Sequence, residues 1–195
     1  MEIDFETGLN RASKRLQDLA NISPTPIVLI DGRAGSGKSL FATRLSDSFF
    51  KENHQAPRIV RLDELYPGWH GLVDGSVYLR EKILEPIAEG KVASWQVWDW
   101  DASSRGAPHE PGNGHREFSG GTPLIVEGCG ALSKAASELA HYAIWIDADT
   151  KVRRKRFSER DGGRYDEFWG VWAAQEDEFY EREQSKGIAE LVIRN

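Results

Sequence analysis

Eight consecutive residues fit the pattern G-x-x-x-x-G-K-[ST] at every position: Gly32-Arg33-Ala34-Gly35-Ser36-Gly37-Lys38-Ser39. Glycines in such a loop let the backbone curl until successive N–H groups point at phosphate oxygens, and the following helix adds its positive dipole end. The spacing predicts that Lys38 reaches the β- and γ-phosphates and that the Ser39 hydroxyl ligates Mg²⁺. We therefore expect Mg²⁺-ATP to bind from Gly32 through Leu40.

Two further residues lie in this loop or next to it. Asp31 ends the preceding apolar run. There it could hold a ligand of the metal in place, or it could cap the turn. The Arg33 side chain is expected to be solvated, within the cofactor-binding loop but outside the chemistry.

The other motifs distinguish among nucleotide-binding proteins. GTPases need an Asn/Thr-Lys-x-Asp motif to read the base, and the chain contains none. Motor ATPases carry an acidic pair after an apolar strand, whereas here the run 124–127 ends in one carboxylate, Glu127, followed by Gly128. This pattern favours transfer of a phosphate to a small molecule.

Asp63 and Glu127 each follow a run that predicts a buried strand. Parallel α/β sheets build their sites at the carboxyl ends of strands, so both carboxylates are expected near the phosphate loop. Phosphoryl transfer needs a group that accepts the proton of the acceptor hydroxyl, and Asp63 is our candidate for that base or for a metal contact. Glu127 is our candidate Mg²⁺ ligand. Turn capping is the alternative for each.

Further candidates could form the wall of an acceptor site. Asp99 lies between two tryptophans, Trp98 and Trp100, whose rings could stack a planar ligand or simply pack in the core. Trp69, on a turn close to Asp63, could line the same site or pack its loop. Arg105 could clamp an acceptor or its phosphate.

The predicted elements alternate between strands and helices. Short β-branched runs without polar alternation predict buried strands, and apolar residues at helical spacing predict helices. Strand-helix alternation of this kind predicts a parallel sheet with helices on both faces. The expected strands are 27–30, 58–62, 124–127, 143–147 and 189–193. The expected helices are 4–20, 38–51, 76–89 (ended or kinked by Pro86), 131–140, 150–160 and 166–184, and we expect 104–123 to be a long loop. The acidic residues of the last helix are expected to form its solvated face: Glu176, Asp177, Glu178, Glu181 and Glu183.

Composition narrows the protein class. The 195 residues suggest one domain, and 25 basic against 31 acidic side chains give a net charge of −6, which argues against a nucleic-acid partner. A single cysteine, Cys129, excludes an internal disulfide framework and is expected to be a small buried residue. No apolar run approaches the ~20 residues of a membrane helix. We expect a cytoplasmic protein without a membrane partner, of undetermined oligomeric state.

With these motifs in place, the chain resembles the uridine kinase-like branch of P-loop nucleoside and nucleotide kinases, from residue 27 to about 193. Asp63-Glu64-Leu65-Tyr66 stands where that family has Asp-x-Phe-Tyr. Trp98-Asp99-Trp100 followed by Ser103-Ser104-Arg105 stands where it has Tyr-Asp-Phe and His-Ser-Arg. Glu127-Gly128 matches a Glu-Gly, and the lid helix spacing is matched by Arg153, Arg156, Arg160 and Asp161.

The resemblance implies a single kinase-like domain over residues 1–195, with a three-layer P-loop NTPase fold and a five-stranded parallel sheet. A small lid would span about 153–166, with Gly162-Gly163 as its hinge, and an acceptor-side region about 66–121. It implies transfer of phosphate from Mg²⁺-ATP to a hydroxyl of a nucleoside, nucleotide or related metabolite. Arg156 and Arg160 would act on the γ-phosphate, Arg153 would contact the nucleotide, and Tyr66 would contact the acceptor.

The chain departs from the family at one acceptor position. Ser103 stands where the pyrimidine-reading histidine would be, so we expect poor phosphorylation of uridine and cytidine. The alternative function, from another class, is an ATP-binding regulatory module or slow ATPase without a small-molecule acceptor.

Overall fold

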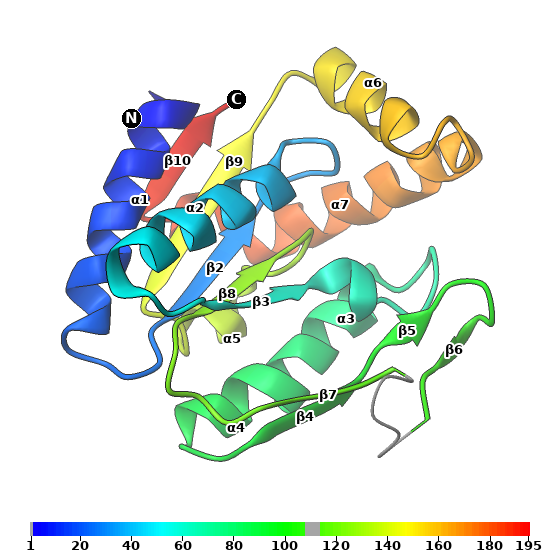
Figure 1. Ribbon diagram of the computed structural model, residues 1–195. Coiled ribbons are helices and arrows are strands. Elements are labelled where there is room, and N and C mark those ends of the chain that lie inside the picture. Colours follow the sequence, from blue (N-terminus) through cyan, green and yellow to red (C-terminus); the bar gives the residue numbers. More distant parts are fainter. Residues whose placement is uncertain (1, 108–113) are drawn as a thin grey trace.

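The computed structural model describes residues 2–107 and 114–195, and its centre is a six-stranded parallel sheet (Figure 1). The strand order is β1-β10-β9-β2-β8-β3. Strands β2 and β8 pair in register from Ile27 opposite Leu124, which brings the carboxyl ends of both strands to one edge. The strands are β1 (Ile3–Asp4), β2 (Ile27–Asp31), β3 (Arg58–Arg61), β8 (Leu124–Glu127), β9 (Tyr142–Asp147) and β10 (Leu191–Arg194).

Helices cover both faces of this sheet (Figure 1). Because side chains alternate along a strand, Val28 and Ile30 pack toward α1 and α2, whereas Ile27 and Leu29 pack toward the opposite helices. All of β2 is buried, as its uninterrupted apolar run predicts. The helices are α1 (Phe5–Ala20), α2 (Lys38–Asn53), α3 (Leu72–Leu79), α4 (Glu85–Ala88), α5 (Lys134–Ser137), α6 (Thr150–Arg160), α7 (Trp169–Glu183) and α8 (Ser185–Ile188).

The parallel α/β fold is confirmed, and the sheet has one strand more than expected. Strand β1 adds to the edge beside β10, with Ile3 opposite Ile193. Its two residues are too few to show the alternation or apolar run by which a strand is recognised in a sequence.

The helix expected over 76–89 is divided into three segments. It begins earlier, at Leu72, and passes through a π-helical turn at Arg80–Leu84 before α4. Pro86 has no N–H to donate to a carbonyl four residues back, and the preceding Glu85 N–H bonds instead to Arg80 O, five residues back. Pro86 therefore marks a change of helix type rather than an end.

Two antiparallel ribbons were not expected from the sequence. Strand β4 (Ala93–Gln96) pairs with β7 (His115–Phe118), and β5 (Trp98–Asp99) pairs with β6 (Ser104–Arg105). The segment 104–123, which we expected to be a loop, therefore contains strands. Its many glycines and prolines had indicated irregular structure instead. Residues 108–113 of that loop lie outside the described residues.

Among the described residues, no helix combines the length and the apolar character needed to cross a bilayer.

Candidate active site

The phosphate loop joins β2 to α2 at the carboxyl edge of the sheet (Figure 1). Gly35 has a φ of +76°, and a Cβ there would come within 2.3 Å of the Arg153 carbonyl oxygen. At Gly32, with φ of +148°, a Cβ would meet the Ile146 carbonyl oxygen at 2.1 Å. Both positions therefore require glycine for space as well as for backbone conformation. Helix α2 begins directly at Lys38, so its positive dipole end faces the loop.

Lys38 is a buried cation, with only 7% of its surface exposed. Its Nζ donates hydrogen bonds to the carbonyl oxygens of Gly32 at 2.7 Å and Arg33 at 3.1 Å. Burial opposes the charge, but the neighbouring Cys129 and Glu127, with two further acidic groups, raise the Lys38 pKa. The ammonium group therefore remains charged at neutral pH, as phosphate binding requires.

Glu127 ends β8 beside the same loop, and it is 4% exposed. Burial raises the pKa of its carboxyl group, while Lys38 and a hydrogen bond from Ser39 oppose that shift. Mg²⁺ in phosphate-transferring sites is held by one or two carboxylates together with substrate phosphates. A hydroxyl and a carboxylate in contact at the loop fit that donor set. The described residues contain no group of three or more His, Cys, Asp or Glu side chains that could by itself hold a metal ion.

Asp63 lies in a 3₁₀ turn (Leu62–Glu64) that directly follows β3. Its carboxylate is 62% exposed and lies 3.6 Å from the guanidinium of Arg160. The side chain opens into the same pocket as Lys38 and Glu127. The structure therefore brings together the phosphate loop and both carboxylates that end a strand.

This pocket has a volume of about 700 Å³. Three kinds of surface line it: the phosphate loop, the strand ends, and aromatic and charged side chains from the lid segment (residues 153–166) and the acceptor side. The lining residues are Ala34, Gly35, Gly37, Lys38, Ser39, Leu40, Asp63, Tyr66, Trp69, Trp100, Asp101, Glu127, Gly128, Cys129, Arg156, Phe157, Arg160, Asp161, Arg164, Tyr165 and Trp172.

The three lid arginines have different surroundings. Arg156 lines the pocket and its guanidinium lies 3.4 Å from the Gly35 carbonyl oxygen. Arg160 lines the pocket beside Asp63. Arg153 is 6% exposed, donates to the Ala34 carbonyl oxygen at 3.2 Å, and is not among the lining residues. Arg153 therefore supports the phosphate loop through a backbone contact and lies outside the pocket.

Three expected acceptor residues do not line this pocket. The Asp99 carboxylate accepts hydrogen bonds from the N–H groups of Asp101 and Ala102, which caps its own turn. Arg105 donates to the carbonyl oxygen of Leu65 at 2.9 Å, and its guanidinium lies 3.7 Å from the centroid of the Tyr78 ring. The Trp98 ring lies near the same arginine, at 5.9 Å. These side chains build the β5–β6 ribbon behind the pocket wall.

The remaining acceptor candidates do line the pocket. Tyr66 is 1% exposed and donates its hydroxyl to the Cys129 carbonyl oxygen at 2.7 Å, so it contributes packing more than a polar contact. Trp69 and Trp100 are partly exposed, with ring centroids 5.0 Å apart. The indole N–H of Trp100 donates to the Asp63 carbonyl oxygen at 2.9 Å. Poor phosphorylation of uridine stays a prediction.

Sequence reasoning placed Glu176 on a solvated helix face, and this was wrong. Glu176 is 1% exposed, and its Oε1 accepts the Ala34 N–H at 2.6 Å and the Cys129 thiol at 3.2 Å. Guanidinium groups of Arg33 and Arg153 lie 3.6 and 3.9 Å away. Its position four residues after Trp172, on the apolar face of α7, was the signal that could have identified it.

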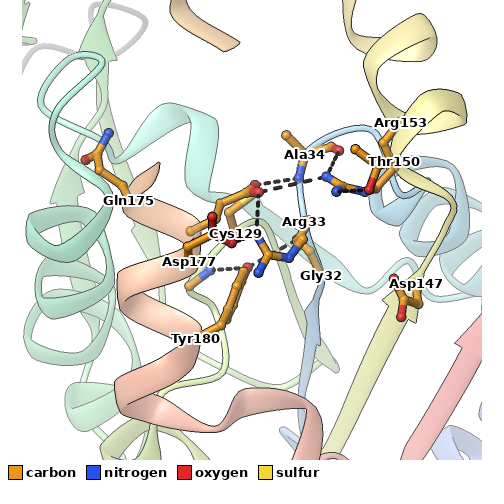
Figure 2. Close-up of polar contacts among 12 residues, drawn as sticks. Gly32, Arg33, Ala34, Cys129, Asp147, Thr150, Arg153, Gln175, Asp177 and Tyr180 are labelled. Atoms are coloured by element: carbon orange, nitrogen blue, oxygen red, sulfur yellow. Dashed lines mark hydrogen bonds and ion pairs between the residues drawn. The ribbon is translucent and has the colours of Figure 1, made fainter. Parts of the chain in front are cut away.

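Arg33 is also less solvated than expected. Its guanidinium contacts the Asp177 carboxylate at 2.6 Å and lies 5.4 Å from the centroid of the Tyr180 ring. Figure 2 shows the Arg33, Asp177 and Tyr180 side chains lying together beside the loop, with Arg153 approaching from α6. Helix α7 thus holds the outer side of the phosphate loop through charged side chains.

Asp31 holds the turns at the ends of two strands. Its carboxylate accepts hydrogen bonds from the N–H groups of Gly32, Gly130 and Leu132 and from the Tyr180 hydroxyl. Complete burial raises the pKa of this carboxyl to about 6, and the hydrogen bonds oppose that shift. Of the two roles left open for Asp31, the contacts are those of a turn cap. Cys129 is buried, as expected, and burial raises the pKa of its thiol.

The chain matches no protein-family model and no curated protein sequence. It is similar to solved structures. One, described as a possible uridine kinase from Bacillus stearothermophilus, has a TM-score of 0.58 at 14% identity over 92% of this chain and 97% of the other. Another, a candidate fructose transport system kinase from a Silicibacter species, has a TM-score of 0.55 at 15% identity over 93% and 97%.

A third is D-glycerate 3-kinase from Cryptococcus neoformans, with a TM-score of 0.51 at 11% identity over 94% of this chain and 89% of the other. At these identities the likeness concerns the fold. The chain therefore has the P-loop kinase fold, as the resemblance in its motifs implied.

Proposed function

We propose that the protein is an Mg²⁺-ATP-dependent kinase that phosphorylates a hydroxyl group of a small acceptor, a nucleoside, nucleotide or related metabolite. The observation that carries this proposal is the shared pocket. Lys38, Ser39 and Glu127 line one part of it, and Asp63 and Arg160 line it beside them. Phosphoryl transfer depends on positioning and charge neutralisation, and this pocket offers groups suited to both.

The phosphate loop would bind the nucleotide. Lys38 and the N–H groups at the start of α2 would neutralise the β- and γ-phosphates. Ser39 and Glu127 would hold Mg²⁺, with Asp63 as a further contact, and the bound metal would supply positive charge to the phosphate oxygens. Arg153 would act on the nucleotide indirectly, through the Ala34 carbonyl oxygen that it holds.

Asp63 would accept the proton. As the acceptor oxygen forms its bond to the γ-phosphorus and the bond to the ADP oxygen breaks, the hydroxyl proton passes to the Asp63 carboxylate. Asp63 is 62% exposed and lines the pocket, so its carboxylate would be able to reach a substrate hydroxyl.

Lid arginines would stabilise the transferring group. Arg156 lies against the phosphate loop and Arg160 beside Asp63, so the two guanidinium groups border the route from nucleotide to acceptor. Charge developing on the γ-phosphoryl oxygens is stabilised by such groups.

The regulatory module or slow ATPase is the less favoured alternative. Binding ATP alone requires neither a carboxylate such as Asp63 in the pocket nor additional pocket space for an acceptor. The neighbours by fold are kinases named for small substrates.

The direct test of this proposal is Asp63→Asn, which keeps the side-chain shape and removes the charge. Phosphotransfer should fall by about 10²–10⁴-fold, the usual contribution of a general base, while ATP affinity changes little. Glu64→Gln, which alters the adjacent carboxylate outside the pocket lining, is the matched control. Unchanged turnover in Asp63→Asn would refute the assignment of the base.

A further inference from the structure

Resting on the proposed kinase function, we propose that Glu176 of α7 is a positioning residue for phosphate transfer. It would set the Lys38 ammonium group through Cys129, and the backbone of the phosphate loop through the Ala34 N–H. Glu176 is 1% exposed and is not among the residues that line the pocket, so it would act on the nucleotide only through these neighbours.

All three protons of the Lys38 ammonium group have partners in the structure. Two are donated to the carbonyl oxygens of Gly32 and Arg33, at 2.7 and 3.1 Å, and the third is donated to the Cys129 sulfur at 3.5 Å. A thiol sulfur is a weak hydrogen-bond acceptor, whereas a phosphate oxygen is a strong one. A phosphate group would therefore replace Cys129 as a partner of Lys38 more readily than it would replace either carbonyl oxygen.

This exchange would occur where the phosphates are expected, because Lys38 and Cys129 both line the pocket. The contact with Cys129 would hold the ammonium group in place before the nucleotide binds. Because the contact is weak, it would compete little with the phosphates afterwards.

Glu176 fixes the direction of the Cys129 thiol. The single thiol proton is donated to Glu176 Oε1 at 3.2 Å, which leaves the sulfur able to accept a proton from Lys38. Burial raises the pKa of the thiol, so the thiol keeps the proton that it donates. The three side chains thus form a chain of hydrogen bonds from α7 to the start of α2. Without the acceptor at Glu176, the thiol could rotate and Lys38 would lose a fixed partner.

The same carboxylate oxygen also fixes the backbone of the loop. Glu176 Oε1 accepts the Ala34 N–H at 2.6 Å. The Ala34 carbonyl oxygen accepts a hydrogen bond from the Arg153 guanidinium at 3.2 Å (Figure 2). Both polar groups of Ala34 are therefore bound by side chains of α6 and α7. Residues 35–39 follow directly and supply the N–H groups that we expect at the phosphates, and donors that are already oriented need no rearrangement during the reaction.

Charge holds Glu176 in this position. Its Oε2 lies 3.6 Å from the Arg33 guanidinium and 3.9 Å from that of Arg153. Arg33 has a second anionic partner in Asp177, at 2.6 Å. Among the described residues, Glu176 is the only one whose carboxylate lies within 4.0 Å of the Arg153 guanidinium. A buried guanidinium group is costly unless it is paired, so Arg153 keeps Glu176 against the loop.

Two substitutions of Glu176 separate its acceptor from its volume. Glu176→Met fills similar space without an oxygen, whereas Glu176→Gln keeps an oxygen that can accept from Ala34 and Cys129. Turnover would be measured with Mg²⁺-ATP and the fastest acceptor among adenosine, D-fructose and D-glycerate. The kcat/KM for ATP should fall by about 10- to 100-fold in Glu176→Met, since small displacements of the reacting groups have effects of this size. Glu176→Gln should stay within about 3-fold of the wild type, because its hydrogen bonds remain but are weaker. Equal losses in both variants would overturn the proposal.

Equilibrium binding supplies a readout that does not depend on turnover. Lys38 is expected at the β- and γ-phosphates, so Glu176→Met should raise the Kd of ATP by about 10-fold and that of ADP by a smaller factor. General loosening of the fold would weaken the two nucleotides equally. Glu178→Met, the same substitution at an exposed position of α7, is the matched control and should leave both Kd values unchanged. If the ratio of the two Kd values in folded Glu176→Met equals that of the control, the proposal is wrong.

Variants of Cys129 test the chain of hydrogen bonds with Glu176 intact, and they decide the proposal if Glu176→Met fails to fold. Cys129→Ala should lower kcat/KM for ATP by about 3- to 10-fold, and Cys129→Ser, whose hydroxyl both donates and accepts, should recover most of that loss. Cys129→Ala combined with Glu176→Met should cost no more than Glu176→Met alone, because both changes break one chain. Additive losses, or wild-type turnover in Cys129→Ala, would contradict the chain.

These measurements separate the role of Glu176 from the proposed function. Normal phosphate transfer in both the wild type and Glu176→Met would overturn the positioning role and leave the kinase proposal standing. If the wild type binds ATP but transfers phosphate to no acceptor, the kinase proposal is refuted, and the ratio of the ATP and ADP Kd values decides the role of Glu176. A wild-type protein that does not bind ATP would refute both.

Discussion

The two ends of the pocket are built in opposite ways. On the phosphate side, charged groups are buried and held by several partners: Lys38 is 7% exposed, Glu176 is 1% exposed and Asp31 is fully buried. On the acceptor side, the charged groups are exposed, as at Asp63 and Asp101, with partners at 3.6 Å. The phosphate loop is thus held rigidly, as the constant nucleotide ligand of the proposed function would require, whereas the acceptor side presents aromatic surface and exposed charges.

On the phosphate side, Lys38→Ala should cause the largest loss of turnover and ATP binding. Loss of a buried cation that faces developing phosphate charge should lower turnover by about 10²–10³-fold and weaken ATP binding. Lys51→Ala, which removes an exposed cation from the far end of the same helix, serves as the control. Isothermal titration with ATP and a far-UV circular dichroism spectrum would measure binding and folding separately, and normal ATP binding and turnover in Lys38→Ala would contradict the assignment.

The contrast in rigidity predicts unequal losses of stability. Glu176→Ala removes one partner from a buried ionic cluster, and breaking such clusters costs about 3–5 kcal/mol of unfolding free energy. Asp99→Ala removes an exposed carboxylate that caps a turn on the acceptor side, and its loss should be clearly smaller. Urea unfolding monitored by fluorescence would compare the two variants.

Similar losses of unfolding free energy in Glu176→Ala and Asp99→Ala would contradict the difference in rigidity between the phosphate side and the acceptor side. Glu176→Gln adds a finer test, because the amide oxygen can still accept the Ala34 N–H while the charge that attracts Arg33 and Arg153 is lost. We expect its stability to lie between that of the wild type and Glu176→Ala.

A smaller effect is the pH dependence of stability that we expect from Asp31, the buried carboxyl group that caps a turn. The Asp31 pKa is raised from 3.8 to about 6 in the folded protein, so between these values the folded state holds a proton that the unfolded state has lost. This carboxyl therefore contributes stability at low pH that is lost as the pH rises toward 6. At ~1.4 kcal/mol for each pKa unit, the change between pH 7 and pH 4.5 is about 2 kcal/mol.

Asp31→Asn cannot titrate, so this contribution would be absent from it. Its overall stability will differ because the amide offers a donor to the Leu132 N–H, but the informative quantity is the slope with pH. The stability of the wild type relative to the variant should increase as the pH falls from 7 to 4.5. A difference that stays constant with pH would contradict the raised pKa.

The phosphate side could be predicted because its information is local. Gly32 through Ser39 are consecutive, and the strand before them and helix after them carry clear patterns. Asp63 and Glu127 were predicted by the same logic, since each ends a recognisable strand and parallel strands end at one edge.

The acceptor side could not be predicted as well because its contacts join distant segments. Nothing near Asp99 or Arg105 in the sequence shows that Asp99 caps its own turn or that Arg105 bonds to the distant Leu65 carbonyl oxygen. The pairing of β4 with β7 across about 20 residues is equally hidden. Tyr165 was not a candidate, since its place in the pocket lining depends on contact with Trp69, far away in the sequence. Glu176 was assigned to a solvated face because a cluster of acidic residues usually marks one. Here it instead lies close to the buried Arg153 and the partly buried Arg33.

The central claim, that this pocket transfers phosphate to an acceptor, is tested most directly by following the phosphorus itself. ATP labelled in its γ-phosphate would be incubated with the protein, Mg²⁺ and a small alcohol such as a nucleoside, and the products would be separated. The account predicts label in the phosphorylated alcohol, formed only when the alcohol is present and lost in Lys38→Ala and Asp63→Asn. Label released only as inorganic phosphate, at a rate that the alcohol does not change, would contradict it and identify a slow ATPase.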